Sequence, residues 1–284
     1  MGVKDTLFSV KKTLNIRGML HALDRPWIMG IVNLTPDSFY DKSRVQREGD
    51  LVKRVEVMLG EGADIIDLGA YSSRPGATHI AEQEEWARLE PAMKVILRNY
   101  PEALISVDTF RSSIARKAYE EGAAMINDIS GGQMDDHMFK AISEIRIPYI
   151  LMHMRGDPRT MNALNTYDNL FKEMVNYFQN RILELKASGV NDIIIDPGFG
   201  FAKSLDQNYE LLKNFTYFEV LGYPLLVGLS RKSMIFKQLG VQPSEALNGT
   251  IALNTVSLLK RASILRVHDI KEAKEVVNLV GKLK

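Results

Sequence analysis

Eight short apolar runs, most of them rich in Ile, Val and Leu, constrain the fold of this chain more than any other feature of its sequence. They span residues 27–32, 63–68, 104–107, 124–126, 148–152, 192–195, 224–227 and 263–267. Apolar runs without polar alternation are typical of strands buried on both faces, as in parallel sheets. The sequence therefore predicts a parallel sheet of eight strands.

The stretches between these runs have helical periodicity. Apolar residues share one face in four of them: Leu51, Val52, Val55, Met58 and Leu59; Trp86, Leu89, Met93, Ile96 and Leu97; Leu170, Met174 and Tyr177; Ala273, Val276, Val277 and Val280. Gly62, Gly122 and Gly189 follow helical segments, where a helix C-cap belongs. Eightfold strand–helix alternation favours an α/β fold of the (β/α)₈ TIM-barrel type. A doubly wound open sheet remains the structural alternative, because periodicity alone does not separate the two.

The length of 284 residues suits one barrel domain, since such barrels take about 250 residues. We expect residues 1–284 to form a single domain whose residues 1–25 are an N-terminal hairpin segment. Within that segment, residues 14–17 and 19–22 flank Gly18 and read as a β-hairpin that caps the bottom of the barrel.

Composition excludes several classes of function. The chain has no cysteine, which rules out disulfides, thiolate metal sites and a cysteine nucleophile. A net charge of +1 gives no reason to expect a nucleic-acid partner or a membrane surface. No apolar run approaches the ~20 residues that span a bilayer, and residues 1–12 lack a signal-peptide core. We therefore expect a cytoplasmic protein.

Polar residues stand at the carboxyl end of every predicted strand. They are Asn33, Asp67, Asp108, Asn127 with Asp128, His153, Asp196, Ser230 to Ser233, and Arg266 with His268 and Asp269. Any one of them alone reads as a helix N-cap or a solvated turn. In a barrel, however, all eight ends converge on the mouth where active sites of this fold lie. The pattern as a whole indicates a functional site.

The residue types suggest what this site recognises. Asp108, Asn127 and Asp196 offer two carboxylates and an amide, which match the donor-rich edge of a 2-amino-4-oxo-pyrimidine ring. Lys232, Arg266 and Arg74 add positive charge at the same mouth. His268 and Asp269 open the last helix, and a helix amino-terminus favours an anion. Together they predict a phosphorylated heterocyclic substrate.

Seven motifs in this sequence resemble those of the dihydropteroate synthase family, in the family's order. They are MGIVNLTPDSF at 29–39, SSRPG at 72–76, SVDT at 106–109, INDI at 126–129, DPGFGF at 196–201, SRKS at 230–233 and RVHD at 266–269. The resemblance runs from about residue 14 to the carboxyl-terminus. It implies a transferase of folate biosynthesis, the target of sulfonamides, that condenses 6-hydroxymethyl-7,8-dihydropterin pyrophosphate with p-aminobenzoate to give 7,8-dihydropteroate and pyrophosphate.

The resemblance also implies a role for each matching residue. Asp108, Asn127, Met152, Asp196, Lys232 and Arg266 would bind the pterin, and Lys232, Arg266 and Asp108 would be catalytic. Asn33, Arg74, Arg266 and His268 would bind pyrophosphate, with Asn33 also a ligand of Mg²⁺. Phe39, Ser73, Pro75, Gly200, Phe201, Lys232 and Ser233 would frame p-aminobenzoate, and Asp67 would support the site. The family also suggests a homodimer through the last helices.

Two segments depart from the family's pattern. Tyr71 replaces the acidic residue that usually precedes the Ser-Thr-Arg of loop 2, and residues 40–44 (YDKSR) replace a loop that is often glycine-rich. We expect these changes to alter loop closure and not the reaction.

Three alternatives follow from the same residues. A pterin-binding methyltransferase domain shares the barrel and the pterin pocket, but it does not need Ser73-Arg74-Pro75 or the SRKS motif at 230–233. A pterin-binding paralogue without activity, or an assembly subunit, is the second. The third concerns one residue: Arg266 could pair with Asp269 and only close the barrel.

Overall fold

The computed structural model describes residues 10–34, 44–71 and 79–283, without the side chains of residues 44–47 and 162. Within these residues, eight strands form one parallel sheet in the order β8-β7-β6-β5-β4-β3-β10-β9. The strands are β3 (Trp27–Asn33), β4 (Ile65–Gly69), β5 (Ile105–Asp108), β6 (Met125–Asp128), β7 (Tyr149–Met152), β8 (Ile193–Asp196), β9 (Leu226–Val227) and β10 (Ile264–Val267).

The two outer strands of this order meet and close the sheet into a barrel. A parallel bridge joins Ile195 of β8 to Leu225, directly before β9, and the Ile195 amide donates to the Pro224 carbonyl at 2.9 Å. This contact confirms the barrel and removes the open-sheet alternative.

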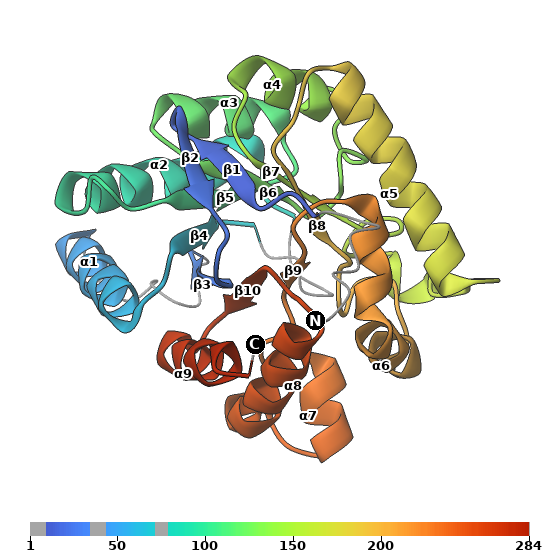
Figure 1. Ribbon diagram of the computed structural model, residues 1–284. Coiled ribbons are helices and arrows are strands. Elements are labelled where there is room, and N and C mark those ends of the chain that lie inside the picture. Colours follow the sequence, from blue (N-terminus) through green and yellow to red (C-terminus); the bar gives the residue numbers. More distant parts are fainter. Residues whose placement is uncertain (1–9, 35–43, 72–78, 284) are drawn as a thin grey trace, which may run out of the picture.

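Helices surround the barrel as an outer layer (Figure 1). They are α1 (Arg44–Glu61), α2 (Glu82–Asn99), α3 (Ser112–Glu120), α4 (Met138–Ile145), α5 (Leu170–Ala187), α6 (Leu205–Lys213), α7 (Ser233–Leu239), α8 (Leu247–Leu259) and α9 (Ile270–Gly281). Short 3₁₀ turns lie at η2 (Met161–Ala163), η3 (Phe215–Leu221) and η4 (Pro243–Glu245). No helix in the described ranges is both long enough and apolar enough to cross a bilayer.

The predicted hairpin is present and lies across one end of the barrel (Figure 1). β1 (Thr13–Ile16) pairs antiparallel with β2 (Met19–Ala22) through a turn at Arg17 and Gly18. Both turn residues have positive φ, 51° and 79°, as a two-residue hairpin turn of the primed type requires. Leu14 and Ile16 are fully buried against the barrel interior.

Side chains alternate along each strand between two apolar cores. Residues such as Ile66, Val107 and Ile195 point outward into the layer beneath the helices. Their neighbours Ile65 and Ile194 point into the barrel and join the hairpin in a separate cluster. Because the side-chain period of a strand is two, the residues two positions after Ile65 and Ile194 also face the barrel interior. These residues are Asp67 on β4 and Asp196 on β8.

Two strands of the barrel begin two residues later than the sequence predicts. β4 begins at Ile65, two residues later than expected, because Asp64 accepts a hydrogen bond from the Ile28 amide through its side chain at 2.8 Å and so belongs to the connection. β9 is only Leu226–Val227, shorter than residues 224–227. The predicted helix-ending glycines are confirmed, with φ of 102° at Gly62 and 94° at Gly122.

Candidate active site

The carboxyl ends of the strands bring the predicted polar residues to one rim. Asn33, Gly69, Asp108 and Asn127 are consecutive cross-strand partners on β3, β4, β5 and β6. Gly69 leaves room between its neighbours, since a Cβ there would lie 3.7 Å from both Asn33 Oδ1 and Asp108 Cβ. The barrel register therefore places an amide, a carboxylate and a second amide side by side.

Arg266 crosses the barrel from β10 to two carboxylates on the other side. Its Nε donates to Asp67 Oδ2 at 2.6 Å, and its Nη2 donates to Asp108 Oδ2 at 2.9 Å. Asp67 Oδ2 also accepts from Asn127 Nδ2 at 3.2 Å. Asp67 is fully buried, so its charge depends on Arg266 for compensation. The sequence prediction of a supporting role for Asp67 agrees with this network.

The structure also shows which cation pairs with Asp269. Asp269 binds Arg231 through two parallel bonds, Nε to Oδ2 at 2.9 Å and Nη2 to Oδ1 at 2.8 Å. The alternative in which Arg266 pairs with Asp269 is therefore wrong. Arg266 binds Asp67 and Asp108 in place of Asp269.

The carboxylates at the rim are held in an environment that resists negative charge. Burial raises the pKa of Asp108, although the Arg266 guanidinium acts in the opposite direction. Burial likewise raises the pKa of Asp196, and Lys232 opposes that shift. Buried carboxylates of this kind are stabilised by a ligand that donates hydrogen bonds to them. Asp67 Oδ1 and Ser106 Oγ, on directly paired residues, are buried without a described partner.

The glycine-rich loop after β8 packs tightly against β7. Asp196 Oδ1 accepts from the Gly198 amide at 2.7 Å. Gly198 has a φ of 70°, and a Cβ there would lie 2.2 Å from the His153 carbonyl oxygen, so no other residue fits. Met152, the cross-strand partner of Asp196, is buried beside the loop with Phe201 and Ala202. Met152 thus presents an apolar surface next to a carboxylate.

Lys203 braces this loop, a role that the sequence analysis missed. Its Nζ donates to the carbonyls of Gly198 and Phe201, both at 3.0 Å, and lies 3.2 Å from His153 Nδ1. Burial lowers the pKa of Lys203 to about 7, with the Asp196 carboxylate opposing the shift. Its place two residues after the DPGFGF motif was the available signal, because free carbonyls of a glycine-rich loop need donors.

Lys232 lies directly before α7 and contacts the loop after β8. Its Nζ donates to the Phe199 carbonyl and lies 4.6 Å from the centre of the Phe201 ring. Burial lowers the pKa of Lys232 to about 8, and Asp196 opposes this shift. Ser233 is the first residue of α7, and Gly200 approaches Lys232 closely, with a Cβ position 3.2 Å from Lys232 Cδ.

His268 lies two residues before α9 and contacts Ser230. Its Nδ1 is 3.1 Å from Ser230 Oγ, which also accepts from the His268 amide at 3.3 Å. Burial lowers the pKa of His268 to about 4, and the Arg266 guanidinium lowers it further. The imidazole is therefore neutral at physiological pH in the ligand-free chain.

Four of the predicted site residues, Phe39, Ser73, Arg74 and Pro75, lie outside the described residues. Tyr71, which replaces the family's usual acidic residue at the start of loop 2, lies within the described residues. It packs edge-to-face on Phe110 at 5.0 Å, and its hydroxyl is 3.3 Å from His79 Nδ1.

Comparison with known proteins agrees with this geometry. The family model described as pterin binding enzyme matches residues 29–268. The chain belongs to this family. It is 41% identical over 260 residues to the dihydropteroate synthase of Escherichia coli K12, covering 91% of this chain and 92% of that protein. It is 40% identical over 252 residues to the dihydropteroate synthase of Clostridium beijerinckii, covering 88% and 91%.

Solved structures of the same family superpose on nearly the whole chain. The Yersinia pestis dihydropteroate synthase, in complex with a sulfonamide drug, is 37% identical with a TM-score of 0.89, covering 95% of this chain and 98% of that one. The Xanthomonas albilineans dihydropteroate synthase with 4-aminobenzoic acid is 34% identical with a TM-score of 0.88, covering 96% and 98%. The prediction of a dihydropteroate synthase, and hence of a transferase, is confirmed.

Proposed function

We propose that this chain joins 6-hydroxymethyl-7,8-dihydropterin pyrophosphate to p-aminobenzoate, releasing pyrophosphate and forming 7,8-dihydropteroate. The observation that carries the proposal is the rim formed by Asp108, Asn127 and Asp196, with Arg266 bonded to Asp108 at 2.9 Å. Carboxylates accept pairs of N–H bonds, and the amide both donates and accepts, so this rim matches the edge of a pterin ring. Met152 supplies an apolar contact for the ring face.

The leaving group is assigned to the side of the mouth where β3 and β10 end. Asn33 ends β3, and Arg266 and His268 lie at the end of β10. In the proposed site they bind pyrophosphate together with Arg74. Electrostatic stabilisation of the departing charge then lowers the barrier.

The residues at this position are compatible with Mg²⁺. Mg²⁺ prefers oxygen ligands, keeps several waters and binds substrate phosphates, so a single protein oxygen is sufficient. The Asn33 Oδ1 atom is such an oxygen, and within the described ranges no group of three acidic or histidine side chains offers a closed metal cage. When bound, the ion would neutralise charge on the pyrophosphate.

The chemical step needs no protein nucleophile. The bond between the pterin methylene carbon and the pyrophosphate oxygen breaks, and the pterin ring delocalises the resulting positive character. The arylamine nitrogen forms the new bond to that carbon and then loses a proton to water. The arylamine lies among Gly200, Phe201, Lys232 and Ser233. Hydrogen bonds from Lys203 and Lys232 to carbonyls of residues 198–201 hold this loop in position.

One assay separates this proposal from the two other functions. The purified protein is mixed with both substrates and Mg²⁺, pyrophosphate release is followed, and the pterin product is identified by mass spectrometry. A dihydropteroate synthase releases pyrophosphate and forms dihydropteroate. A pterin-binding protein without activity binds pterin in calorimetry but releases nothing. A methyltransferase domain binds a reduced pterin and does not respond to p-aminobenzoate.

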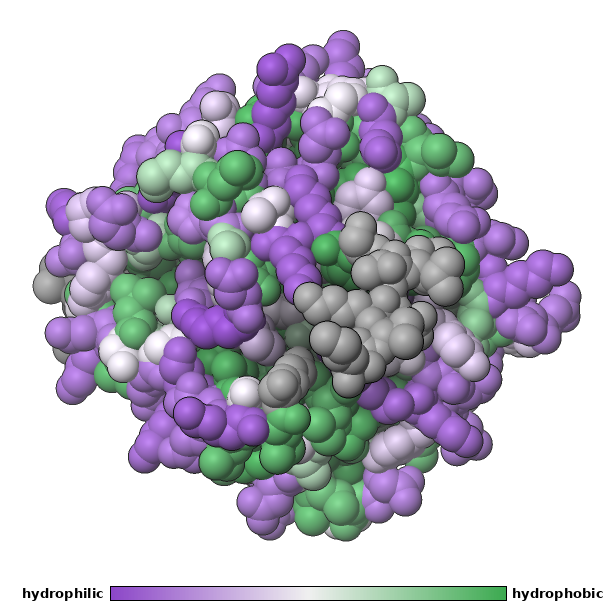
Figure 2. All heavy atoms as spheres, viewed as in Figure 1, coloured by the Kyte–Doolittle hydropathy of each residue, from purple (hydrophilic) through white to green (hydrophobic). Residues whose placement is uncertain are grey.

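We further propose that the chain is a cytoplasmic homodimer assembled through its last helices. Leu239, Leu259 and Leu279, on α7, α8 and α9, are all more than half exposed. Figure 2 shows hydrophobic residues gathered over the region of α7 and α8. Helix α8 has no charged residue, and it buries Thr250, Asn254 and Ser257. Its apolar residues Ile251, Leu253 and Val256 are only partly buried, which is unusual for a helix facing water. Light scattering tests this, with Leu259→Lys expected to shift the protein towards monomer.

A further inference from the structure

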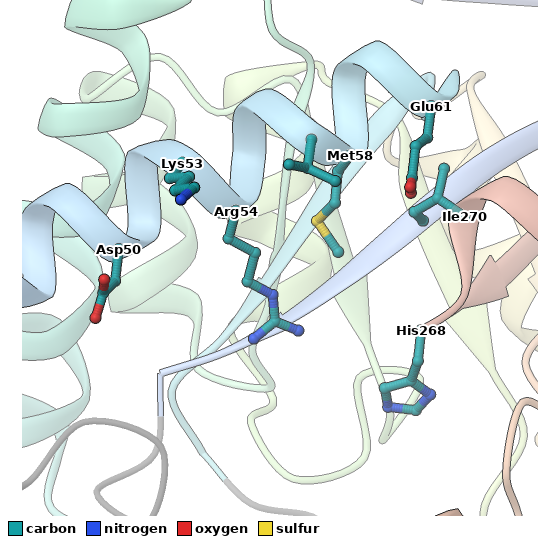
Figure 3. A pocket seen from close by; sticks show the side chains of 8 residues that line it. Asp50, Lys53, Arg54, Met58, Glu61, His268 and Ile270 are labelled. Carbon is teal, nitrogen blue, oxygen red and sulfur yellow. The ribbon is translucent and has the colours of Figure 1, made fainter.

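A groove runs along the outer side of the barrel mouth, between α1 and the start of α9 (Figure 3). It encloses about 370 Å³ and is lined by Asp50, Lys53, Arg54, Val57, Met58 and Glu61 of α1 and by His268 and Ile270. His268 belongs to the proposed pyrophosphate site. The groove therefore leads from that site to the surface between the two helices.

Arg54 places a guanidinium at the inner end of this groove. Its Nη2 donates to the Ile31 carbonyl at 3.0 Å, two residues before Asn33 at the end of β3. Figure 3 shows the side chain leaving α1 towards the end of β3, with His268 across the groove from it. One bond to a backbone carbonyl fixes the guanidinium and leaves other N–H groups available, since arginine carries five donors.

The three arginines around His268 differ in how their charge is compensated. Arg266 binds Asp67 and Asp108, and Arg231 binds Asp269. No ion pair joins Arg54 to any carboxylate in the part of the chain that the structure describes. The charged groups that act on the His268 imidazole are Arg266, Asp269, Arg231 and Arg54. Of these cations, Arg54 is the one that pairs with no carboxylate among the residues that the structure describes.

We propose that Arg54 is a further residue of the pyrophosphate site. It binds the pyrophosphate group on the side of the groove and guides the released product outward between α1 and α9. The inference rests on the proposed function and deepens it. Two buried carboxylates offset much of the charge of Arg266, so Arg54, which pairs with no carboxylate among the described residues, adds positive charge to the anion site.

The test measures inorganic pyrophosphate binding to the full-length protein by calorimetry. Arg54→Gln should weaken that binding about tenfold or more, because a charge-assisted bond to the anion is lost. The KM for the pterin pyrophosphate should rise with it, while the KM for p-aminobenzoate and the affinity for a pterin without phosphate should stay within about twofold. Lys53→Gln is the matched control, since it removes the same charge from the adjacent residue of the groove, which is exposed as Arg54 is.

Pyrophosphate affinity within twofold of wild type for Arg54→Gln would overturn the proposal, as would an equal loss for Lys53→Gln, which would indicate only a general field. Arg54→Met, which keeps an apolar stem, gives the same readout if the glutamine variant does not fold. The proposal is separable from the reaction itself. If the wild-type protein makes no dihydropteroate but the pyrophosphate affinities follow this pattern, the anion site stands and the proposed function fails.

Discussion

The two ends of the barrel interior are built from the same strands and have opposite chemistry. At the hairpin end, Ile65, Ile194 and Ile264 are fully buried in an apolar cluster. At the mouth, their strands place Asp67, Asp196 and Arg266 two residues farther along. The change from apolar to charged thus occurs within one repeat of a strand's side-chain period.

The hairpin end of the barrel therefore stabilises the fold, and the mouth carries the groups that act on a ligand. Apolar burial stabilises the folded state in proportion to area, so the hairpin end contributes stability. Buried charges cost desolvation energy, and the pairing of Asp67 and Asp108 with Arg266 offsets part of it. A barrel keeps such a cluster where a ligand uses it.

The largest effect is expected at the hairpin end. Ile194→Ala removes a fully buried side chain from the inner cluster and should lower the free energy of unfolding by about 2–5 kcal/mol. Pterin affinity per folded molecule should change less than twofold. Urea unfolding and calorimetry measure the two quantities. A large loss of affinity in the folded variant would mean that the two ends are not independent.

Asp196→Asn, a change on the same strand, should weaken pterin binding without lowering the free energy of unfolding. Asp196→Asn keeps the shape and keeps an oxygen for the Gly198 amide, but it removes the charge that receives the pterin. Affinity for a pterin fragment should fall by about 2–3 kcal/mol. Stability should stay level or rise, because burial already raises the pKa of Asp196 and the amide mimics its neutral form. Unchanged pterin affinity in calorimetry would remove Asp196 from the site.

Arg266→Lys separates the shape of the cation from its charge. Lysine keeps the charge but cannot reproduce the planar fork that reaches Asp67 through Nε and Asp108 through Nη2. Turnover, corrected for the folded fraction by thermal melts, should fall on the order of tenfold or more, as expected for loss of one charge-assisted bond. Near-wild-type turnover would contradict the bridging role.

The smallest effect concerns the pH dependence of stability at the mouth. The pKa of His268 is lowered to about 4, so the unfolded chain binds this proton more tightly than the folded one. Wild-type stability should therefore fall as the pH drops from about 6.5 towards 4. His268→Gln should lose less, with a difference on the order of 1 kcal/mol at about pH 5 after allowance for solvent screening. Melting temperatures are measured for both proteins across this pH range. If they fall equally as the pH drops, the histidine does not titrate in this way.

Much of this fold and site was predictable from local patterns. The apolar runs gave the strands, the glycine at position 62 gave a helix end, and the polar strand ends gave the rim of Asp108, Asn127 and Asp196. Each of these signals depends on neighbouring residues and on the periods of strand and helix, which the order of residues fixes directly.

Side-chain pairing across the barrel was not predictable in this way. Arg266 binds Asp67 across 199 positions of sequence, and Arg54 meets His268 from the opposite side of a groove. These partners depend on how far the sheet turns before Ile195 meets Leu225 and on which helices then become neighbours. The sequence by itself determined which residues reach the mouth. Only the closed barrel decided which charges meet there, because pairing energies depend on distances that exist only after closure.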